Sequence, residues 1–184
     1  MTNRIPLKSR LKSRLGWLGA VAFSSVAIGI GSIVSTSSPA AAQAAYGSYI
    51  GIGGSFGVTD GPNGEGGSGG GVIAVRYKFL EVPISIRAQA LIGETTAFVP
   101  TVSYDVPLNW HTDAYIGMGA AFQDSNESAS PVGNQTSFVL QPGIDHTFPY
   151  SNVVLFGNAI IAFDAYKNSN DTAASIQGGV GVRF

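Results

Sequence analysis

Hydrophobic residues in this chain alternate with small or polar residues, and the alternation recurs in eight segments after residue 45. Along residues 72–80, for example, Ile73 and Val75 fall on one face and Arg76 falls on the other. Because successive side chains of a β-strand point to opposite faces, a period of two predicts strands. The predicted strands span residues 46–58, 72–80, 84–93, 98–106, 112–122, 136–146, 152–163 and 172–184.

The composition favours one kind of β-protein. Charged residues make up 11% of the chain, against roughly 25% in soluble domains, and the mean hydropathy is +0.22. Hydrophobicity that is spread over alternating strands is typical of membrane β-barrels, and their strand number is even in bacteria. Strands of about 9–11 residues also cross a bilayer at a tilt. We therefore expect an all-β fold: an eight-stranded antiparallel up-and-down transmembrane β-barrel.

Residues 1–44 have the layout of a cleavable secretory signal peptide. Five basic residues and no acid lie in residues 1–14, an uncharged apolar run covers residues 15–34, and residues 40–45 are rich in alanine. The triplet Ala42-Gln43-Ala44 favours cleavage after Ala44, with cleavage after Ala42 as the alternative. A retained membrane anchor is the other interpretation, but the glycines and serines of the run favour a signal peptide. The expected domains are the signal peptide, residues 1–44, and the barrel, residues 45–184.

Cleavage would change the charge balance. Residues 45–184 hold five basic and 11 acidic residues, a formal net charge of −6 instead of −1. Contacts with phosphate groups need clustered Lys and Arg, and no basic cluster is left. The sequence therefore predicts no nucleic-acid partner.

Seven charged residues share the polar faces of the predicted strands. A Lys or Arg that faces lipid at the bilayer midplane costs roughly 2–4 kcal/mol, so these side chains are expected inside the barrel. An eight-stranded barrel is just wide enough for side chains to fill, and buried charges need partners. We expect an ion-pair network that fills the interior; the alternative is the charged lining of a narrow permeation path. The seven residues are Arg76, Lys78, Arg87, Asp105, Asp113, Asp145 and Arg183.

Aromatic residues gather near the ends of the predicted strands, as in the aromatic girdles of membrane barrels. The alternative is strand-end packing in a soluble barrel. Two prolines, Pro100 and Pro142, lie inside predicted strands, where they cannot donate a ladder hydrogen bond and would mark bulges or strand ends. The aromatic residues are Tyr46, Phe79, Phe98, Trp110, Phe122, Phe148, Tyr150, Phe163 and Phe184.

The chain ends in the sequence IQGGVGVRF, with apolar residues at alternate positions before a terminal phenylalanine. This resembles the C-terminal strand of bacterial outer-membrane barrels. Together with the other features, it makes residues 45–184 resemble a small OmpA/OmpX-type outer-membrane β-barrel protein of Gram-negative type. The resemblance implies contacts with outer-membrane lipid and lipopolysaccharide. It also implies recognition by the barrel-assembly machinery, with Val180, Val182 and Phe184 as the assembly signal.

The connections between the predicted strands differ in length. Three connections are turns, at residues 81–83, 107–111 and 147–151. Of the other four, three are long polar loops, at residues 59–71, 123–135 and 164–171, and one, at residues 94–97, is short. Membrane barrels have short periplasmic turns and longer outer loops. A chain that enters from the periplasm would therefore place residues 59–71 on the outside.

No constellation of residues points to an enzyme or a cofactor. The absence of cysteine excludes thiol catalysis and Cys-bound zinc. His111 and His146 lie in or beside predicted turns, outside any HExxH, Walker or nucleophile-elbow motif. The glycine-rich residues 64–71 lack a lysine and a following helix, which indicates a flexible loop. We therefore expect no catalytic residue, no cofactor and no metal site.

Acidic residues populate the longer connections: Asp60, Glu65, Asp124, Glu127, Asp164 and Asp171. Solvated carboxylates are the simpler interpretation; the alternative is that they bind divalent cations which bridge lipopolysaccharide.

The sequence leaves several functions open. The leading hypothesis is a non-enzymatic outer-membrane barrel with a structural or surface-interaction role in the cell envelope, whose surface ligand is unknown. The alternative is a narrow porin-like channel for small solutes. A lipid-modifying enzyme would need a Ser or an acid near an outward-facing His, which the sequence does not offer. The last alternative is a soluble secreted barrel, which washing of the membrane fraction would distinguish because a soluble barrel would be released.

Overall fold

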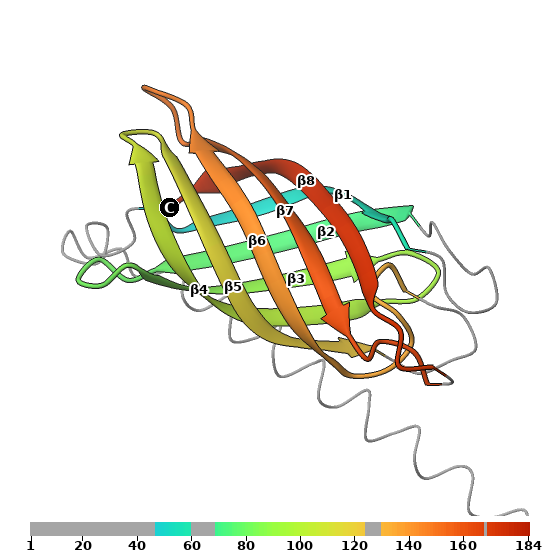
Figure 1. Ribbon diagram of the computed structural model, residues 1–184. Helices are drawn as coiled ribbons and strands as arrows, with labels where there is room; N and C mark the ends of the chain where they lie inside the picture. Colours follow the sequence, from blue (N-terminus) through green and yellow to red (C-terminus); the bar gives the residue numbers. More distant parts are fainter. Residues whose placement is uncertain (1–46, 60–68, 124–129, 168) are drawn as a thin grey trace, which may run out of the picture. The chain divides into compact units, whose positions relative to one another are not determined.

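The computed structural model describes residues 47–59, 69–123, 130–167 and 169–184, which form a closed antiparallel β-barrel (Figure 1). Every strand pairs with its neighbours in the sequence, and β1 pairs with β8 to close the barrel. The expected all-β fold with eight up-and-down strands is confirmed. The strands are β1 (Tyr49–Gly57), β2 (Gly69–Lys78), β3 (Ile84–Ile92), β4 (Ala97–Asn109), β5 (Thr112–Gln123), β6 (Ser137–Thr147), β7 (Val153–Phe163) and β8 (Ala173–Arg183).

The predicted signal peptide, residues 1–44, lies outside the described residues and stays a prediction. Within the described part of the chain, no helix has the length and apolar character needed to cross a membrane.

The strand boundaries differ from the predicted ones by a few residues. Strand β2 begins at Gly69, inside the predicted glycine-rich loop, because its first residues pair with β1. Strand β4 continues to Asn109, so the β4–β5 connection is a two-residue turn at residues 110–111 instead of residues 107–111. The register shifts between Pro107 and Asn109, which is where the ladder accommodates the extra length.

Pro100 and Pro142 are not bulges or strand ends, contrary to the interpretation from the sequence. Pro100 pairs with Ala88 of β3, and Pro142 pairs with Ile116 of β5. Each proline also has a second neighbouring strand, which is β5 for Pro100 and β7 for Pro142. The pairing register with that strand is the same on both sides of the proline. A proline removes one donor but keeps an extended backbone, so the flanking pairs hold the register.

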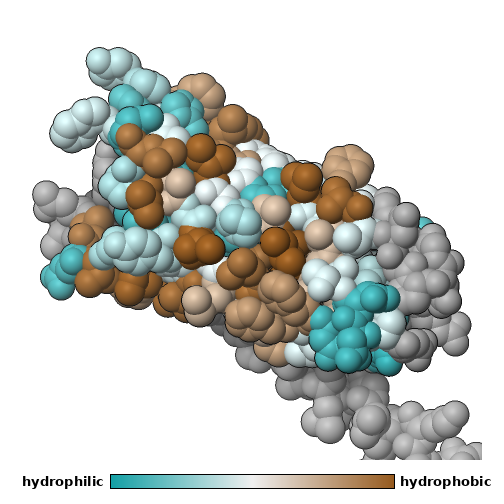
Figure 2. Space-filling view, viewed as in Figure 1, coloured by the Kyte–Doolittle hydropathy of each residue, from teal (hydrophilic) through white to brown (hydrophobic). Residues whose placement is uncertain are grey.

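The outer face of the barrel wall is apolar. Large hydrophobic side chains are exposed along every strand; Ile52 is 65% exposed and Met118 is 59% exposed. Figure 2 shows such side chains over much of the viewed wall. The inner face carries small, polar and charged side chains together with buried hydrophobic ones such as Leu91 and Ile160, so the alternation of the sequence becomes a difference between outside and inside.

The two ends of the barrel differ. We call the end with the connections 79–83, 110–111 and 148–152 the turn end. The opposite end, with the connections 58–68, 93–96, 124–136 and 164–172, is the loop end. Charged side chains fill the interior at the turn end, whereas a hydrophobic cluster fills it toward the loop end. The expected ion-pair network therefore occupies only one part of the interior.

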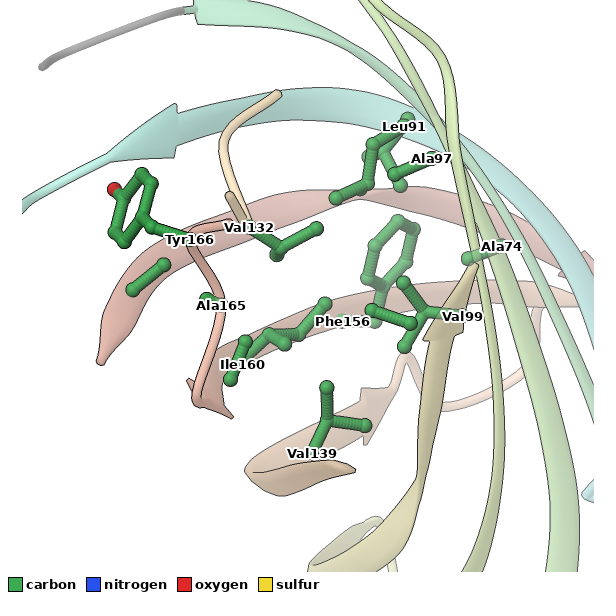
Figure 3. Packing of buried hydrophobic residues seen from close by; sticks show 14 of the residues in the cluster. Ala74, Leu91, Ala97, Val99, Val132, Val139, Phe156, Ile160, Ala165 and Tyr166 are labelled. Carbon is green, nitrogen blue, oxygen red and sulfur yellow. The ribbon is translucent and has the colours of Figure 1, made fainter. Parts of the chain in front are cut away.

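Figure 3 shows the buried hydrophobic residues inside the barrel, and we call those toward the loop end the apolar plug. Leu91, Val99, Val139 and Ile160 are completely buried in it. Leu91 broke the predicted alternation of its strand because its side chain points into this plug. The plug consists of Val72, Leu91, Ala97, Val99, Ala121, Val132, Val139, Ile160, Ala162, Ala165, Tyr166 and Ala173.

Candidate functional site

Six charged side chains meet inside the barrel at the turn end, and we call them the ion-pair cluster. They sit at inward positions of five consecutive strands, β2 to β6, where the closed barrel brings them together. Four of the six are at most 3% exposed. The cluster consists of Arg76, Lys78, Arg87, Asp105, Asp113 and Asp145.

Arg76 is the centre of the cluster. Its Nη2 lies 2.7 Å from Asp105 Oδ2 and 2.9 Å from Asp113 Oδ2, and its Nη1 lies 3.0 Å from Asp145 Oδ2. Its Nε donates to Ser85 Oγ at 3.2 Å. The guanidinium group therefore links carboxylates from three strands, which its planar fork of donors makes possible.

Arg87 forms a second bridge between two of these carboxylates. Its Nη2 lies 3.2 Å from Asp105 Oδ1 and 2.9 Å from Asp145 Oδ2. Its guanidinium carbon lies 3.3 Å from the centre of the Tyr115 ring, a cation–π contact. The Tyr49 hydroxyl donates to Asp145 Oδ1 at 3.0 Å. Arg87 is thus held by charges and by an aromatic ring.

Two serines complete the environment of Asp105. Ser103 Oγ donates to Asp105 Oδ1 at 2.9 Å, and Ser85 Oγ donates to Asp105 Oδ2. Buried ion pairs are favourable only when further hydrogen bonds satisfy the charged groups. Asp105 meets this condition, and the cluster as a whole balances three cations with three carboxylates.

Two of the cations predicted to lie inside the barrel are close to its turn end. Lys78 Nζ lies 2.8 Å from Asp113 Oδ2, and its side chain keeps 25% exposure. Arg183, near the end of β8, is half-buried, and its Nη2 donates to the Ser151 carbonyl at 2.7 Å. All seven charged residues that the sequence placed on inner faces thus lie inward, six of them in one cluster and Arg183 beside it.

A pocket of about 330 Å³ opens above the ion-pair cluster at the turn end, and we call it the vestibule. Its lining includes Arg76 and Asp145, which are buried, and Lys78, Asp113 and Arg183, which are partly exposed. The rim is formed by the turns between β4 and β5 and between β6 and β7. The rim residues include Trp110, His111, Phe148, Pro149 and Tyr150.

The loop end is covered by residues from two connections. Val132 and Ala165 are completely buried in the apolar plug although both lie outside the strands. The Ala165 carbonyl accepts hydrogen bonds from the N–H groups of Asn134 at 2.9 Å and Gln135 at 3.2 Å. Gln123 Nε2 donates to the Gln135 carbonyl at 2.6 Å. The two connections therefore bind each other and β5, and they fill the barrel from this end.

The histidines do not form a reactive site. His111 lies exposed in the β4–β5 turn, and His146 Nδ1 lies 3.0 Å from Thr112 Oγ1. Among the described residues, no group of three or more His, Cys, Asp or Glu side chains is arranged to hold a metal ion. Of the loop acids, Asp164 and Asp171 are exposed. The other four, and the glycine-rich stretch up to residue 68, lie outside the described residues.

The residues predicted as an assembly signal lie on the outer face at the turn end. Val180, Val182 and Phe184 are all about half exposed, at 52%, 56% and 50%. Their role in assembly stays a prediction.

No family model and no curated protein matches the sequence. Solved structures do match the fold. Ail, the attachment invasion locus protein of Yersinia pestis, aligns with a TM-score of 0.53 at 19% identity, over 74% of this chain and 97% of that chain. Its complex with the heparin analogue sucrose octasulfate aligns with a TM-score of 0.50 at 17% identity, over the same shares. Neisserial surface protein A aligns with a TM-score of 0.48 at 17% identity, over 75% of this chain and 97% of that chain.

The chain has the fold of the small eight-stranded outer-membrane barrels. At these identities the likeness establishes the architecture, and a shared architecture does not establish a shared activity.

Some features of the site were missed in the sequence. The vestibule was not predicted, because its walls come from strands and turns that meet only when the barrel closes. One signal of the apolar plug was present: Ile160, together with Phe156 of the same hydrophobic cluster, makes the inner face of β7 unusually apolar. Val132 gave no signal, since it lies in a connection that reads as a polar loop.

Proposed function

We propose that this protein is an outer-membrane β-barrel with a non-enzymatic structural or surface-interaction role in the cell envelope. The observation that carries the proposal is the contrast between the two faces of the wall. The outer face exposes large hydrophobic side chains on every strand, while the charges of the strands lie inside. A water-soluble protein rarely exposes so continuous an apolar surface, whereas lipid requires it.

Aromatic side chains at both ends of the wall support the same proposal. Phe56, Phe98 and Phe163 are exposed near the loop end, and Trp110 and Tyr150 are almost fully exposed at the turn end. Amphipathic rings prefer the level of the lipid headgroups. Two bands of rings at the ends of an apolar wall fit a barrel that spans one bilayer.

The filled interior supports a structural role over the alternative of a narrow channel. The ion-pair cluster occupies the interior at the turn end, and the apolar plug occupies it toward the loop end. A permeant solute would have to break buried ion pairs and then pass between buried hydrophobic side chains, and both steps are unfavourable.

The charge of the loop end indicates which surface partner it would suit. The connections at that end hold seven acidic residues and one basic residue, Lys167. Charge complementarity favours a cationic partner, or divalent cations that bridge to lipopolysaccharide phosphates. A sulfated polyanion such as the one bound in the Ail complex would be repelled.

Fractionation of cells that express the full chain tests the proposal. We expect the protein in the washed outer-membrane fraction, at a mass that corresponds to cleavage after Ala44. We also expect it to migrate faster in a detergent gel before boiling than after, because a closed ladder with all backbone groups paired resists detergent. Recovery in the soluble fraction without a heat-dependent shift would refute the membrane assignment.

A further inference from the structure

A third layer of side chains lies between the ion-pair cluster and the apolar plug, and we call it the amide belt. Along β3, the inward residue Gln89 lies between Arg87 of the cluster and Leu91 of the plug. Thr101 has the equivalent position in β4, as Gln141 does in β6. The belt consists of uncharged polar side chains that are at most 6% exposed: Ser55, Gln89, Thr101, Gln141, Asn158, Ser175 and Gln177.

Two short hydrogen-bond chains run through the amide belt. In the first, Thr101 Oγ1 donates to Gln141 Oε1 at 2.6 Å, and Gln141 Nε2 donates to Asn158 Oδ1 at 3.3 Å. In the second, Gln177 Nε2 donates to the hydroxyls of the two serines of the belt, at 2.6 and 3.3 Å. Asn158 Nδ2 and Gln177 Oε1 have no hydrogen-bond partner in the described part of the chain.

Exchanging the oxygen and nitrogen atoms of these amides does not pair the remaining atoms. If the first chain were reversed, Asn158 Nδ2 would donate to Gln141, and Asn158 Oδ1 would be the unpaired atom. If Gln177 were reversed, its Oε1 would accept from the two serines, and its Nε2 would be unpaired. Either orientation leaves one amide atom on Asn158 and one on Gln177 without a partner, which is costly for buried groups.

These unpaired groups lie in the same part of the belt. Asn158 and Gln177 are directly opposite each other on β7 and β8. The Tyr115 hydroxyl also has no partner in hydrogen-bond geometry, and it lies beside Asn158. A Cβ built on Gly143 would be 2.5 Å from Tyr115 Oη and 2.7 Å from Asn158 Cβ. An N–H donor, an amide oxygen and a hydroxyl therefore gather between three strands.

The mixture of donors and acceptors indicates which ligand fits. A cation would be held by oxygen atoms alone, and an anion by donors alone. The belt offers both, so a small neutral molecule that donates and accepts fits best, and water is that molecule. The belt also has room: a Cβ built on Gly117, opposite Gln141, would meet no atom closer than 3.4 Å.

We propose that the amide belt binds buried water, with one molecule that accepts a hydrogen bond from Asn158 Nδ2 and donates one to Gln177 Oε1. The Tyr115 hydroxyl is its third partner. Because the ion-pair cluster and the apolar plug enclose the belt from both ends, this water exchanges slowly with the solvent.

Nuclear magnetic resonance of the 15N-labelled full chain in detergent micelles tests the proposal. The measurement is the Overhauser effect between the water signal and the side-chain amide protons of Asn158 and Gln177. Water that is held for long gives cross-peaks of opposite sign in laboratory-frame and rotating-frame spectra, whereas chemical exchange gives the same sign in both. We expect opposite signs at both residues. We expect no such pair of cross-peaks at Gln135, whose side-chain amide is near the surface of the loop end.

A variant shows where the water is bound. Asn158→Leu has nearly the same shape but lacks the donor, so the long-lived water cross-peak at Gln177 should be lost. Asn152→Leu makes the same change at an exposed position of the β6–β7 turn and is the matched control, which should keep the cross-peak. The heat-dependent gel shift verifies that each variant is folded, and the spectra of the unchanged protein decide the proposal if Asn158→Leu does not fold.

Two results would overturn the proposal. The first is the absence of opposite-sign water cross-peaks at Asn158 or at Gln177, as a direct hydrogen bond between the two amides would give. The second is an unchanged water cross-peak at Gln177 in folded Asn158→Leu. Neither result bears on whether the barrel lies in the outer membrane, which the fractionation tests separately.

Discussion

At the scale of single residues, the buried charges are the most demanding feature of the protein. Arg76 and Arg87 are each 3% exposed, and both reach Asp105 and Asp145. Such groups stabilise the fold only as a complete set, because each one alone would be a desolvated charge. The cluster therefore makes the stability of the barrel sensitive to any member of it.

Asp105→Ala should destabilise the barrel by about 3–5 kcal/mol, because it leaves two buried guanidinium groups and two serine hydroxyls without their shared acceptor. Urea unfolding of the protein in lipid vesicles measures this free energy. Asp171→Ala, at an exposed position of the loop end, is the control and should change stability by less than about 1 kcal/mol. Equal effects of the two variants would contradict a structural role of the cluster.

Gly133→Ala should open the loop end locally. Gly133 has a φ of +105°, and a Cβ there would lie 2.2 Å from the Ala165 carbonyl oxygen. We expect a local cost of about 1–3 kcal/mol, seen as faster amide hydrogen exchange in residues 130–135. Gly157→Ala is the matched control, because its Cβ would meet no atom closer than 3.9 Å. Unchanged exchange in Gly133→Ala would show that the two connections do not depend on this close contact.

At the scale of the elements, each strand keeps its register through the alternation of its faces. A slip by one residue would turn a whole strand inside out, placing charges on the wall and hydrophobic side chains in the ion-pair cluster. This explains why Pro100 and Pro142 are tolerated within β4 and β6. Loss of one hydrogen-bond donor costs less free energy than a register shift, because a shift would move the charged side chains to the outer face and the hydrophobic ones to the inner face.

Val102→Lys tests whether the wall faces lipid. Val102 lies on the outer face in the middle of β4 and is 52% exposed. A lysine facing the middle of a bilayer should reduce the free energy of folding into vesicles by about 2–4 kcal/mol. Leu80→Lys places the same side chain in the turn after β2, where it can extend to water, and should cost about 0–1 kcal/mol. A small cost at both positions would indicate that water surrounds the wall.

At the scale of the whole molecule, the barrel combines a charged interior at one end with a largely apolar one at the other. The vestibule leads down to the ion-pair cluster and not through it, while Val132 and Ala165 fill the barrel from the opposite side. The same closure that removes exposed strand edges also brings side chains of eight strands into contact across the interior.

We expect no single-channel steps from the purified protein in planar lipid bilayers. The reason is that the interior is occupied at two levels, by ion pairs and by the apolar plug. Insertion is verified in the same bilayers by protease protection of the strands. Reproducible steps of defined size from inserted protein would instead favour the narrow channel for small solutes.

Much of the architecture could be predicted from the alternation of residues alone. The eight strands and the inward position of Arg76, Asp105 and Arg183 follow from a period of two and from the cost of a charge in lipid. These are local properties: each strand shows its two faces without reference to any other strand. Boundaries were less certain, as at Asn109, because pairing with a neighbour decides where a strand ends.

The contacts across the interior were decided only by the tertiary structure. Asp145 binds Arg87, which is 58 positions away in the sequence, and Tyr49, which is 96 positions away. A period of two does not specify such pairs. The position of Val132 in the apolar plug likewise depends on how two connections fold over the barrel. The alternation within each strand indicates which of its residues face inward. Which of them meet depends on the strand register and the closure of the barrel, which join residues far apart in the chain.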